Sequence, residues 1–230
     1  MKKTLVLILV ETALELVPYE LWRHPSVLKH ALSKGKDVGE LLLDRSYHHA
    51  AMLKLKYSER RGRPDIAHFS LLEATSSPLY LRGSMDIYIH TIKDNVIKLG
   101  SSVRLPKSHF RFKGLIEQLF KEKKIVTPDN QVLLKIKKQS FKDLIDEIKP
   151  SVTIGTSRLG KRNTFEGVAK ELGKYQKPVL IVGGFPRSHF SPDISSNFNQ
   201  LYSCHTLPLE AHVVIARIVY EFEKLLNSSK

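Results

Sequence analysis

An uninterrupted apolar run near the N-terminus limits the architectures open to this chain. Residues 4–10 read Thr-Leu-Val-Leu-Ile-Leu-Val, with no polar side chain at alternate positions. A strand with one face in water alternates polar and apolar residues, so this run predicts a central strand of a parallel sheet, buried on both faces. Glu11 and Glu15 follow at once without a small-residue cleavage site, which argues against a secretion signal. No stretch approaches the roughly 20 apolar residues of a membrane span, so we expect a soluble, cytoplasmic protein.

Predicted strands and helices alternate along the rest of the chain. Strands are expected at 41–44, 85–91, 96–99, 151–155, 178–184 and 201–203, and helices at 18–33, 50–57, 66–74, 112–124, 165–173 and 211–226. Asp94 and Asn95 supply turn residues for a hairpin between the second and third of these strands. This order predicts an α/β fold with a mainly parallel sheet and an inserted hairpin. The last helix has an apolar stripe wide enough to face both a core and a second subunit.

Positive charge dominates the composition and gathers in two short segments. The 230 residues carry a formal net charge of +14, with 37 Lys and Arg against 23 Asp and Glu. The segments are Arg-Pro-Asp-Ile at 63–66, and 103–112 with its Val-Arg-Leu-Pro-Lys and Arg-Phe. Each places cationic side chains beside a proline that stiffens the backbone, which favours fixed contacts with the phosphates and bases of RNA. The alternative is a lysine-rich surface that serves solubility.

Candidate ligand-binding residues lie in the C-terminal third. Gly183 and Gly184 end a predicted buried strand, where small molecules approach an α/β sheet. Thr-Leu-Pro-Leu at 206–209 precedes the last helix and could present backbone amides and carbonyls to an adenine edge. The same loop could instead be only a hydrophobic staple for the helix. Residues 155–162 lack a P-loop because Arg162 stands where Ser or Thr is required.

The sequence contains no familiar metal-binding or nucleophile signature. Its ten histidines include no H-x-x-x-H spacing, and Cys204 is the only cysteine. A disulfide framework and a cysteine-built metal site are therefore excluded, and the single thiol is typical of a reducing compartment. No G-x-S-x-G motif is present. We therefore expect no bound metal.

Four segments together resemble the Nep1/Emg1 family of ribosome-biogenesis proteins, in its archaeal form. They are Arg-Pro-Asp-Ile-x-His at 63–68, Val-Arg-x-Pro-Lys with a following Arg-Phe at 103–112, Val-Gly-Gly at 182–184, and Pro-Leu before the last helix. The resemblance spans essentially the whole chain in the same order. It implies a SPOUT-class methyltransferase with a C-terminal trefoil knot, which methylates N1 of a pseudouridine in small-subunit ribosomal RNA.

The resemblance also implies a cofactor, partners and site residues. A single domain, 1–230, would bind S-adenosylmethionine in a knot region at about 150–230 and RNA through an insertion at about 45–113, with the RNA crossing a homodimer. The residues carried over are Gly183, Ser188, His189, Phe190, Cys204, His205, Thr206, Leu207, Pro208 and Leu209 for the cofactor, and Arg63, Asp65, Arg104, Lys107 and Arg111 for RNA. Two positions depart from the family pattern, because Lys107 stands where Arg is frequent and Ser188 where Gly is common.

Asp65 and Arg63 are the implied catalytic residues, and the role of Asp65 has two interpretations. It could accept the N1 proton while Arg63 and Arg104 stabilise the anion that develops on the uracil carbonyls. It could instead orient the base, or form a salt bridge with Arg63 or Arg104 that only shapes the loop. Two other functions also stay open: an assembly factor whose RNA binding matters more than catalysis, and a methyltransferase that acts on transfer RNA.

Overall fold

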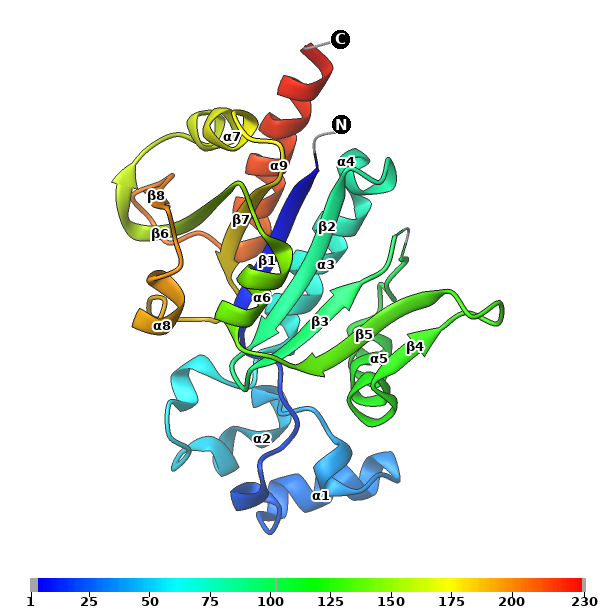
Figure 1. Ribbon diagram of the computed structural model, residues 1–230. Helices are drawn as coiled ribbons and strands as arrows, with labels where there is room; N and C mark the ends of the chain where they lie inside the picture. The colour runs from blue at the N-terminus through cyan, green and yellow to red at the C-terminus, as the bar shows by residue number, and fades with distance from the viewer. Residues whose placement is uncertain (1–3, 102, 229–230) are drawn as a thin grey trace.

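A single twisted sheet runs through the centre of the computed structural model, which describes residues 4–101 and 103–228 (Figure 1). The ends of the predicted 1–230 domain, 1–3 and 229–230, lie outside the described residues. Within them the eight strands follow the order β4-β5-β3-β2-β1-β7-β6-β8. Their bounds are β1 (Leu5–Thr12), β2 (Met85–Thr91), β3 (Asn95–Leu99), β4 (Lys124–Val126), β5 (Val132–Lys138), β6 (Val152–Arg162), β7 (Pro178–Gly183) and β8 (Gln200–Ser203).

β1 occupies the middle of this sheet, as its apolar run predicts. It pairs in parallel with β2 on one side and β7 on the other, and all of its residues are buried. Successive side chains point to opposite faces, so Leu5, Leu7 and Leu9 join one core while Val6, Ile8 and Val10 join the other. β7, β6 and β8 continue the parallel pairing, whereas β3, β5 and β4 are antiparallel. The predicted α/β class with a mainly parallel sheet is confirmed.

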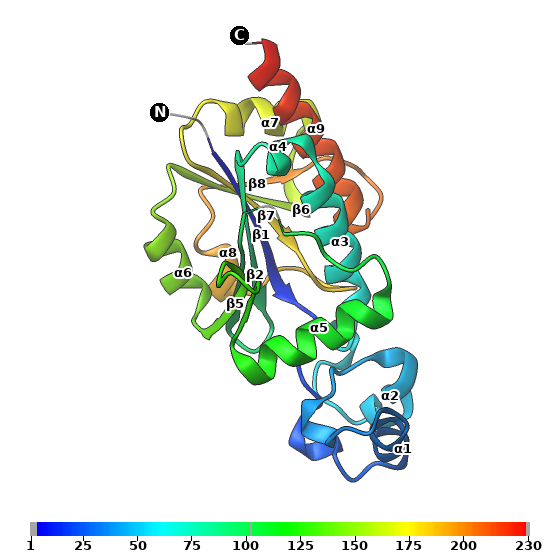
Figure 2. The ribbon, with the colours of Figure 1, turned by 90° about the vertical axis from the view of Figure 1, so that its right-hand side faces the viewer.

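Helices cover both faces of the sheet, as Figure 2 shows. The larger core lies beneath α3 (Pro64–Ser76), α5 (His109–Glu122), α7 (Phe165–Gly173) and α9 (Ala211–Ser228), with α4 (Pro78–Leu81) beside α3. The smaller core lies beneath α6 (Phe141–Ile148) and α8 (Pro192–Ser195). α9 packs against α3 and α7, and Ile215, Ile218 and Phe222 of its apolar stripe are buried in the chain's own core.

A small helical lobe stands beyond the carboxyl end of β1 (Figure 1). It contains α1 (Pro25–Lys34), α2 (Arg45–Met52) and three short 3-10 turns, Tyr19–Leu21, Val38–Glu40 and Ser58–Arg60, around its own apolar cluster. The helix predicted at 18–33 begins only at Pro25, because the preceding residues form the first 3-10 turn.

The predicted strand at 41–44 is wrong. Leu41 and Leu43 fill the apolar cluster of the lobe, while Leu42 packs into the main core and forms only an isolated bridge with Leu16. This segment is buried because it links the two cores, and no neighbouring strand is available to pair with it. Asp44 then caps α2 by accepting a hydrogen bond from the Ser46 N–H, so the helix predicted at 50–57 lies at Arg45–Met52 instead.

Most other elements match the predicted ones, with differences mainly at their ends. The hairpin β2–β3, helix α7 and strands β7 and β8 are found where the sequence predicts them. β6 continues well past the predicted 151–155. The sequence-based prediction has no counterpart for β4, β5 or α6. Residues 103–108, in the second basic segment, form no regular strand, but Val103 and Leu105 are buried.

Buried polar groups join the lobe to α5. Lys113 of α5 pairs with Asp44 at 2.5 Å, and the Asp44 N–H donates to Nδ1 of His48 at 3.1 Å. Since Nδ1 of His48 accepts, its Nε2 carries the proton and donates to Nδ1 of His30 at 2.9 Å. Tyr47 stacks on His30 with ring centroids 4.0 Å apart. Burial lowers the pKa of His48 to about 4, from an ordinary value of 6.5, and also lowers the pKa of His30.

We predict that acid destabilises the protein through His48. The folded pKa lies below the unfolded one, so the unfolded chain binds more protons, and stability present above pH 6.5 is lost as the pH falls towards 4. At about 1.4 kcal/mol per unit of pKa, the loss is about 3 kcal/mol. Urea unfolding at pH 7 and pH 4.5 should show a smaller loss for His48→Gln than for the wild type. Equal losses in the two proteins would contradict this assignment.

Candidate active site

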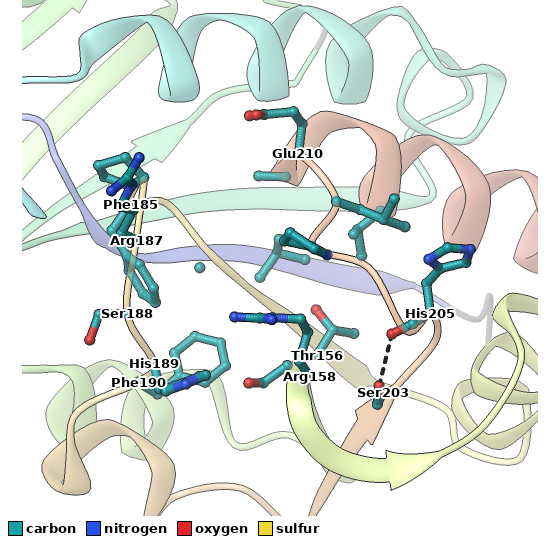
Figure 3. A pocket seen from close by; sticks show the side chains of 18 of the residues that line it. Thr156, Arg158, Phe185, Arg187, Ser188, His189, Phe190, Ser203, His205 and Glu210 are labelled. Carbon is teal, nitrogen blue, oxygen red and sulfur yellow. Dashed lines mark hydrogen bonds between the residues drawn. The ribbon is translucent and has the colours of Figure 1, made fainter.

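A hollow opens beside β7, at the start of the loop that follows it, between β6 and β8. It has a volume of about 550 Å³, within the usual range for a small-molecule site. Figure 3 shows the 185–190 loop on one side of the cavity and Arg158, Ser203 and His205 on the other. The lining residues are Arg63, Ile66, Thr156, Ser157, Arg158, Val182, Gly183, Phe185, Pro186, Arg187, Ser188, His189, Phe190, Tyr202, Ser203, Cys204, His205, Leu207, Pro208, Leu209, Glu210, Ala211 and Val214.

Close backbone approach fixes the loop that follows β7. Gly184 donates its N–H to the Val10 carbonyl and accepts from the Ala13 N–H, each at 2.9 Å. A Cβ at Gly184 would lie 2.8 Å from the Cα of Thr12, so only glycine lets the loop lie this close to β1. Ser188 then adopts a φ of 94°, in the region that favours glycine. The chain keeps a glycine-like turn at this position although it carries a serine.

The loop between β8 and α9 forms the opposite wall. The Ser203 hydroxyl donates to the His205 carbonyl at 3.2 Å, and the Leu207 N–H donates to Nδ1 of His205 at 3.0 Å (Figure 3 for the first bond). These bonds hold the extended turn open towards the cavity. Burial raises the pKa of the Cys204 thiol to about 11, so this sulfur stays protonated at neutral pH and is a poor nucleophile.

Most of the residues predicted to hold a ligand meet in this cavity. Gly183, the turn 188–190, and the loop residues 204, 205 and 207–209 all line it. Thr206 is exposed and does not line it, because the turn directs this residue away from the cavity. The loop that follows β7 and the loop that follows β8 therefore face one another across the hollow.

The Arg-Pro-Asp segment lies at the mouth of the cavity. Pro64 begins α3, which places Arg63 at the N-cap and Asp65 in the first turn. Arg63 holds both carboxylate oxygens of Asp65, through Nε at 2.8 Å to Oδ1 and Nη2 at 2.7 Å to Oδ2. The hydrogen bond to Asp65 raises the pKa of the Arg63 guanidinium. Arg63 lines the cavity, and Asp65, its ion-pair partner, is not among the lining residues.

The second basic segment is joined to the first through a histidine. His68 of α3 is buried, bonds the Pro106 carbonyl through Nε2 at 2.8 Å, and stacks on Phe112 with centroids 4.4 Å apart. Arg104, Lys107 and Arg111 are exposed, and none of the ion pairs among the described residues involves them. Their charges therefore remain available to a ligand outside the cavity.

Several lining residues have no counterpart in the sequence-based prediction. Thr156, Ser157 and Arg158 come from β6, in a stretch considered only as a failed P-loop, and Glu210 immediately precedes α9. The available signal was the position of β6. The parallel pairing of β6 with β7 ends at Thr156 and Val182, so the residues of β6 at that point border the same site.

Comparisons with known proteins place this architecture in a family. A sequence model described as EMG1/NEP1 methyltransferase matches residues 7–223. The chain belongs to the EMG1/NEP1 methyltransferase family. It is 40% identical over 227 residues to the ribosomal RNA small subunit methyltransferase Nep1 of Staphylothermus marinus, covering 99% of this chain and 98% of that protein. It is 39% identical over 223 residues to the Nep1 of Pyrococcus furiosus, covering 97% and 98% respectively.

A solved family member has the same fold. The crystal structure of Archaeoglobus fulgidus Nep1 bound to S-adenosylhomocysteine matches with a TM-score of 0.86 at 30% identity, over 99% of this chain and 100% of that one. The resemblance read from the four sequence segments is thus confirmed for the family and for the fold. Among the residues that the structure describes, no helix is long and apolar enough to cross a membrane, and no His, Cys, Asp and Glu group is suited to a metal ion.

Proposed function

We propose that this family member transfers a methyl group from S-adenosylmethionine to N1 of a pseudouridine in small-subunit ribosomal RNA, in the cytoplasm. The observation that carries the proposal is the position of the Arg63–Asp65 pair at the mouth of the cavity built by the β7 and β8 loops. A polar recognition pair beside a pocket of cofactor size is what group transfer between a small molecule and a base requires. The S-adenosylhomocysteine bound to the Archaeoglobus relative and the names of the curated relatives support this choice.

The cavity suits S-adenosylmethionine in its size and in its mixture of side chains. Leu207, Leu209 and Val214 offer apolar contact to an adenine ring, and the hydroxyls of Thr156 and Ser203 add polar groups. Arg158 extends into the cavity, where its guanidinium is suited to a carboxylate (Figure 3). When bound, the cofactor supplies an electrophilic methyl group on a sulfonium. We propose that residues of about 150–230 form this site as a trefoil knot.

RNA is the substrate class that the surface charge favours. The net charge of +14 and the exposed Arg104, Lys107 and Arg111 beside α3 suit a polyanion. The His68–Pro106 bond holds this segment against the helix that carries Asp65. We propose that the range of about 45–113 binds the RNA backbone while Arg63 and Asp65 face the target base. Lys107 supplies a point charge in place of a bidentate guanidinium contact.

The protein's part in the reaction is to orient the base and to help N1 lose its proton. Both oxygens of Asp65 accept from Arg63, so the carboxylate has a fixed direction. Oδ2 accepts two of these bonds, whereas Oδ1 accepts one and keeps a lone pair for N1–H. Arg63 offers positive charge close to the carbonyls on which the anion develops. The protonated Cys204 does not compete for the methyl group.

We also propose a homodimer. Tyr220 of α9 is 59% exposed, and it lines a groove between α9 and the start of α4 together with Pro78 and Ala216. Most of the apolar stripe of α9 is buried in the chain's own core, so the surface of this groove is the part of α9 that can contact a second copy. RNA that crosses two copies would meet two sets of the basic segments.

The proposed activity predicts methyl incorporation that depends on pseudouridine. The protein is incubated with labelled S-adenosylmethionine and paired small-subunit RNA fragments that differ only in uridine or pseudouridine at the target. We expect label only in the pseudouridine fragment. Binding of the fragment without methyl incorporation would favour an assembly factor. Labelling of transfer RNA alone would favour a methyltransferase that acts on transfer RNA.

Replacement of Asp65 by Asn separates chemistry from binding. The change keeps the size of the side chain and removes no positive charge, so RNA affinity should stay within about threefold, because RNA affinity depends mainly on cation–phosphate contacts. Loss of a positioned proton acceptor lowers methylation by a factor on the order of 100. Single-turnover rates and filter binding measure the two effects, with Asp146→Asn on the exposed face of α6 as the control. Near-normal turnover would reduce Asp65 to a residue that shapes the loop.

A further inference from the structure

Glu11 is a buried carboxylate that neither the cavity lining nor the proposed chemistry accounts for. It stands near the end of β1, where it is 8% exposed, after six apolar residues of the same strand. Its φ is 48°, in the left-handed region that residues with a Cβ avoid. Such a backbone persists only where surrounding contacts hold it, and it occurs preferentially at functional sites.

The Glu11 side chain joins two segments that are distant in sequence. One oxygen, Oε2, accepts from Arg60 Nη2 at 2.9 Å and from the Ser191 N–H at 3.1 Å. The Arg60 guanidinium also lies 4.4 Å from the ring centroid of Phe185. Ser191 and Phe185 are at the two ends of the loop that walls the cavity, and Arg60 lies three residues before Arg63. A single carboxylate therefore fastens the 185–191 loop to the 58–65 segment.

Further contacts show that residues 11–15 serve both sides. Arg61 forms a buried bidentate pair with Glu15, with both N–O distances 2.6 Å, and the Arg63 N–H donates to the Ala13 carbonyl. On the other side, the Ala13 N–H donates to Gly184. Residues 11–15 at the end of β1 therefore contact both the segment that carries Arg63 and Asp65 and the loop that follows β7.

Arg60 is the link that substitution can remove. Its Nε is buried and has no hydrogen-bond partner among the residues that the structure describes, so Glu11 and the Phe185 ring are the principal contacts of Arg60. The Arg61–Glu15 pair is tighter and more deeply buried, and it continues to hold the segment when Arg60 is replaced. Loss of Arg60 therefore removes the side-chain link between the 185–191 loop and the 58–65 segment without dismantling the lobe, while the backbone bonds of Ala13 remain.

We propose that Glu11 and Arg60 are positioning residues that couple the cofactor loop to the base-binding segment, so that RNA and cofactor each raise the affinity of the other. The proposal rests on the proposed function for the identity of the two ligands. When the cofactor orders the 185–191 loop, Phe185 and Ser191 hold Glu11 and Arg60 in place. Arg60 in turn restrains the segment that leads to Arg63. Less conformational entropy is then lost when the second ligand binds, and the coupling is reciprocal.

The test is calorimetry of S-adenosylhomocysteine binding with and without a pseudouridine-containing small-subunit RNA fragment. In the wild type, RNA should tighten binding by about fivefold or more, the lower end of usual coupling. In Arg60→Gln, the ratio of the affinity with RNA to the affinity without RNA should fall towards one. The affinity for S-adenosylhomocysteine in the absence of RNA should change by less than about threefold, because Arg60 does not line the cavity. Arg60→Lys, which keeps the charge, should restore part of the ratio.

Controls separate coupling from stability and from the reaction itself. Lys137→Gln, on β5, breaks an exposed ion pair with Glu147 of α6 and should keep the wild-type ratio. If Arg60→Gln does not fold, Glu11→Gln provides the same measurement with a neutral acceptor for Ser191. A ratio of one in the wild type, or an unchanged ratio in the variants, overturns the proposal. S-adenosylhomocysteine has no methyl group to transfer, so either result leaves the methylation assay to decide the proposed function independently.

Discussion

β1 is covered by helices on both faces, and this burial determines where the chain can place polar groups. Six successive residues of the strand are apolar, and the first carboxylate, Glu11, comes only where the strand reaches the edge of the sheet. The next residues, 12–15, bond the loop after β7 on one side and the segment before α3 on the other. The buried strand therefore brings together the loop after β7, proposed to hold the cofactor, and the segment before α3, proposed to face the target base.

Ion pairs with little exposure hold the helical lobe in register with this edge. Glu15 with Arg61 and Asp44 with Lys113 are the two most buried. Loss of one partner of such a pair typically costs about 3–5 kcal/mol, because the remaining charge stays in a poorly solvating interior. One pair joins Asp44 to Lys113 of α5, and the other joins Glu15, after β1, to Arg61 and so helps to fix the direction of residues 58–65. The orientation of Arg63 and Asp65 follows from that direction, because both residues lie in this segment.

The sequence predicts the helices and strands whose hydrophobic periodicity reflects one kind of surroundings along the whole element. β1, β7 and α7 each face one kind of surroundings along their length, so periodicity identifies them. Residues 41–44 have the composition of a strand, but they are buried because they join two cores. β5 alternates buried Leu134 and Ile136 with exposed lysines, a period-two pattern that could have been recognised. Strand pairing across 30 residues or more, as between β6 and β8, leaves no local signal.

The site divides in the same way. Gly183 and the loop at 204–209 could be chosen from strand ends, proline and family resemblance, and most of them line the cavity. Arg158 and Glu210 could not, because their roles depend on which strands are neighbours. The Arg63–Asp65 contact was foreseen as one alternative, and its bidentate geometry required the helix start at Pro64. Arg60 and Glu11 were not foreseen, since only the folded chain brings them together.

The most direct measurement is S-adenosylhomocysteine affinity of Gly183→Arg, by calorimetry. A Cβ at Gly183 would already lie 2.9 Å from the Phe185 ring, and the longer side chain would enter the cavity. Gly114→Arg adds the same charge on α5, where a Cβ meets nothing within 4 Å, and thermal unfolding of both variants verifies that they are folded. The account predicts that binding is lost in Gly183→Arg and retained in Gly114→Arg. Wild-type affinity in a folded Gly183→Arg protein would contradict the placement of the cofactor in this cavity.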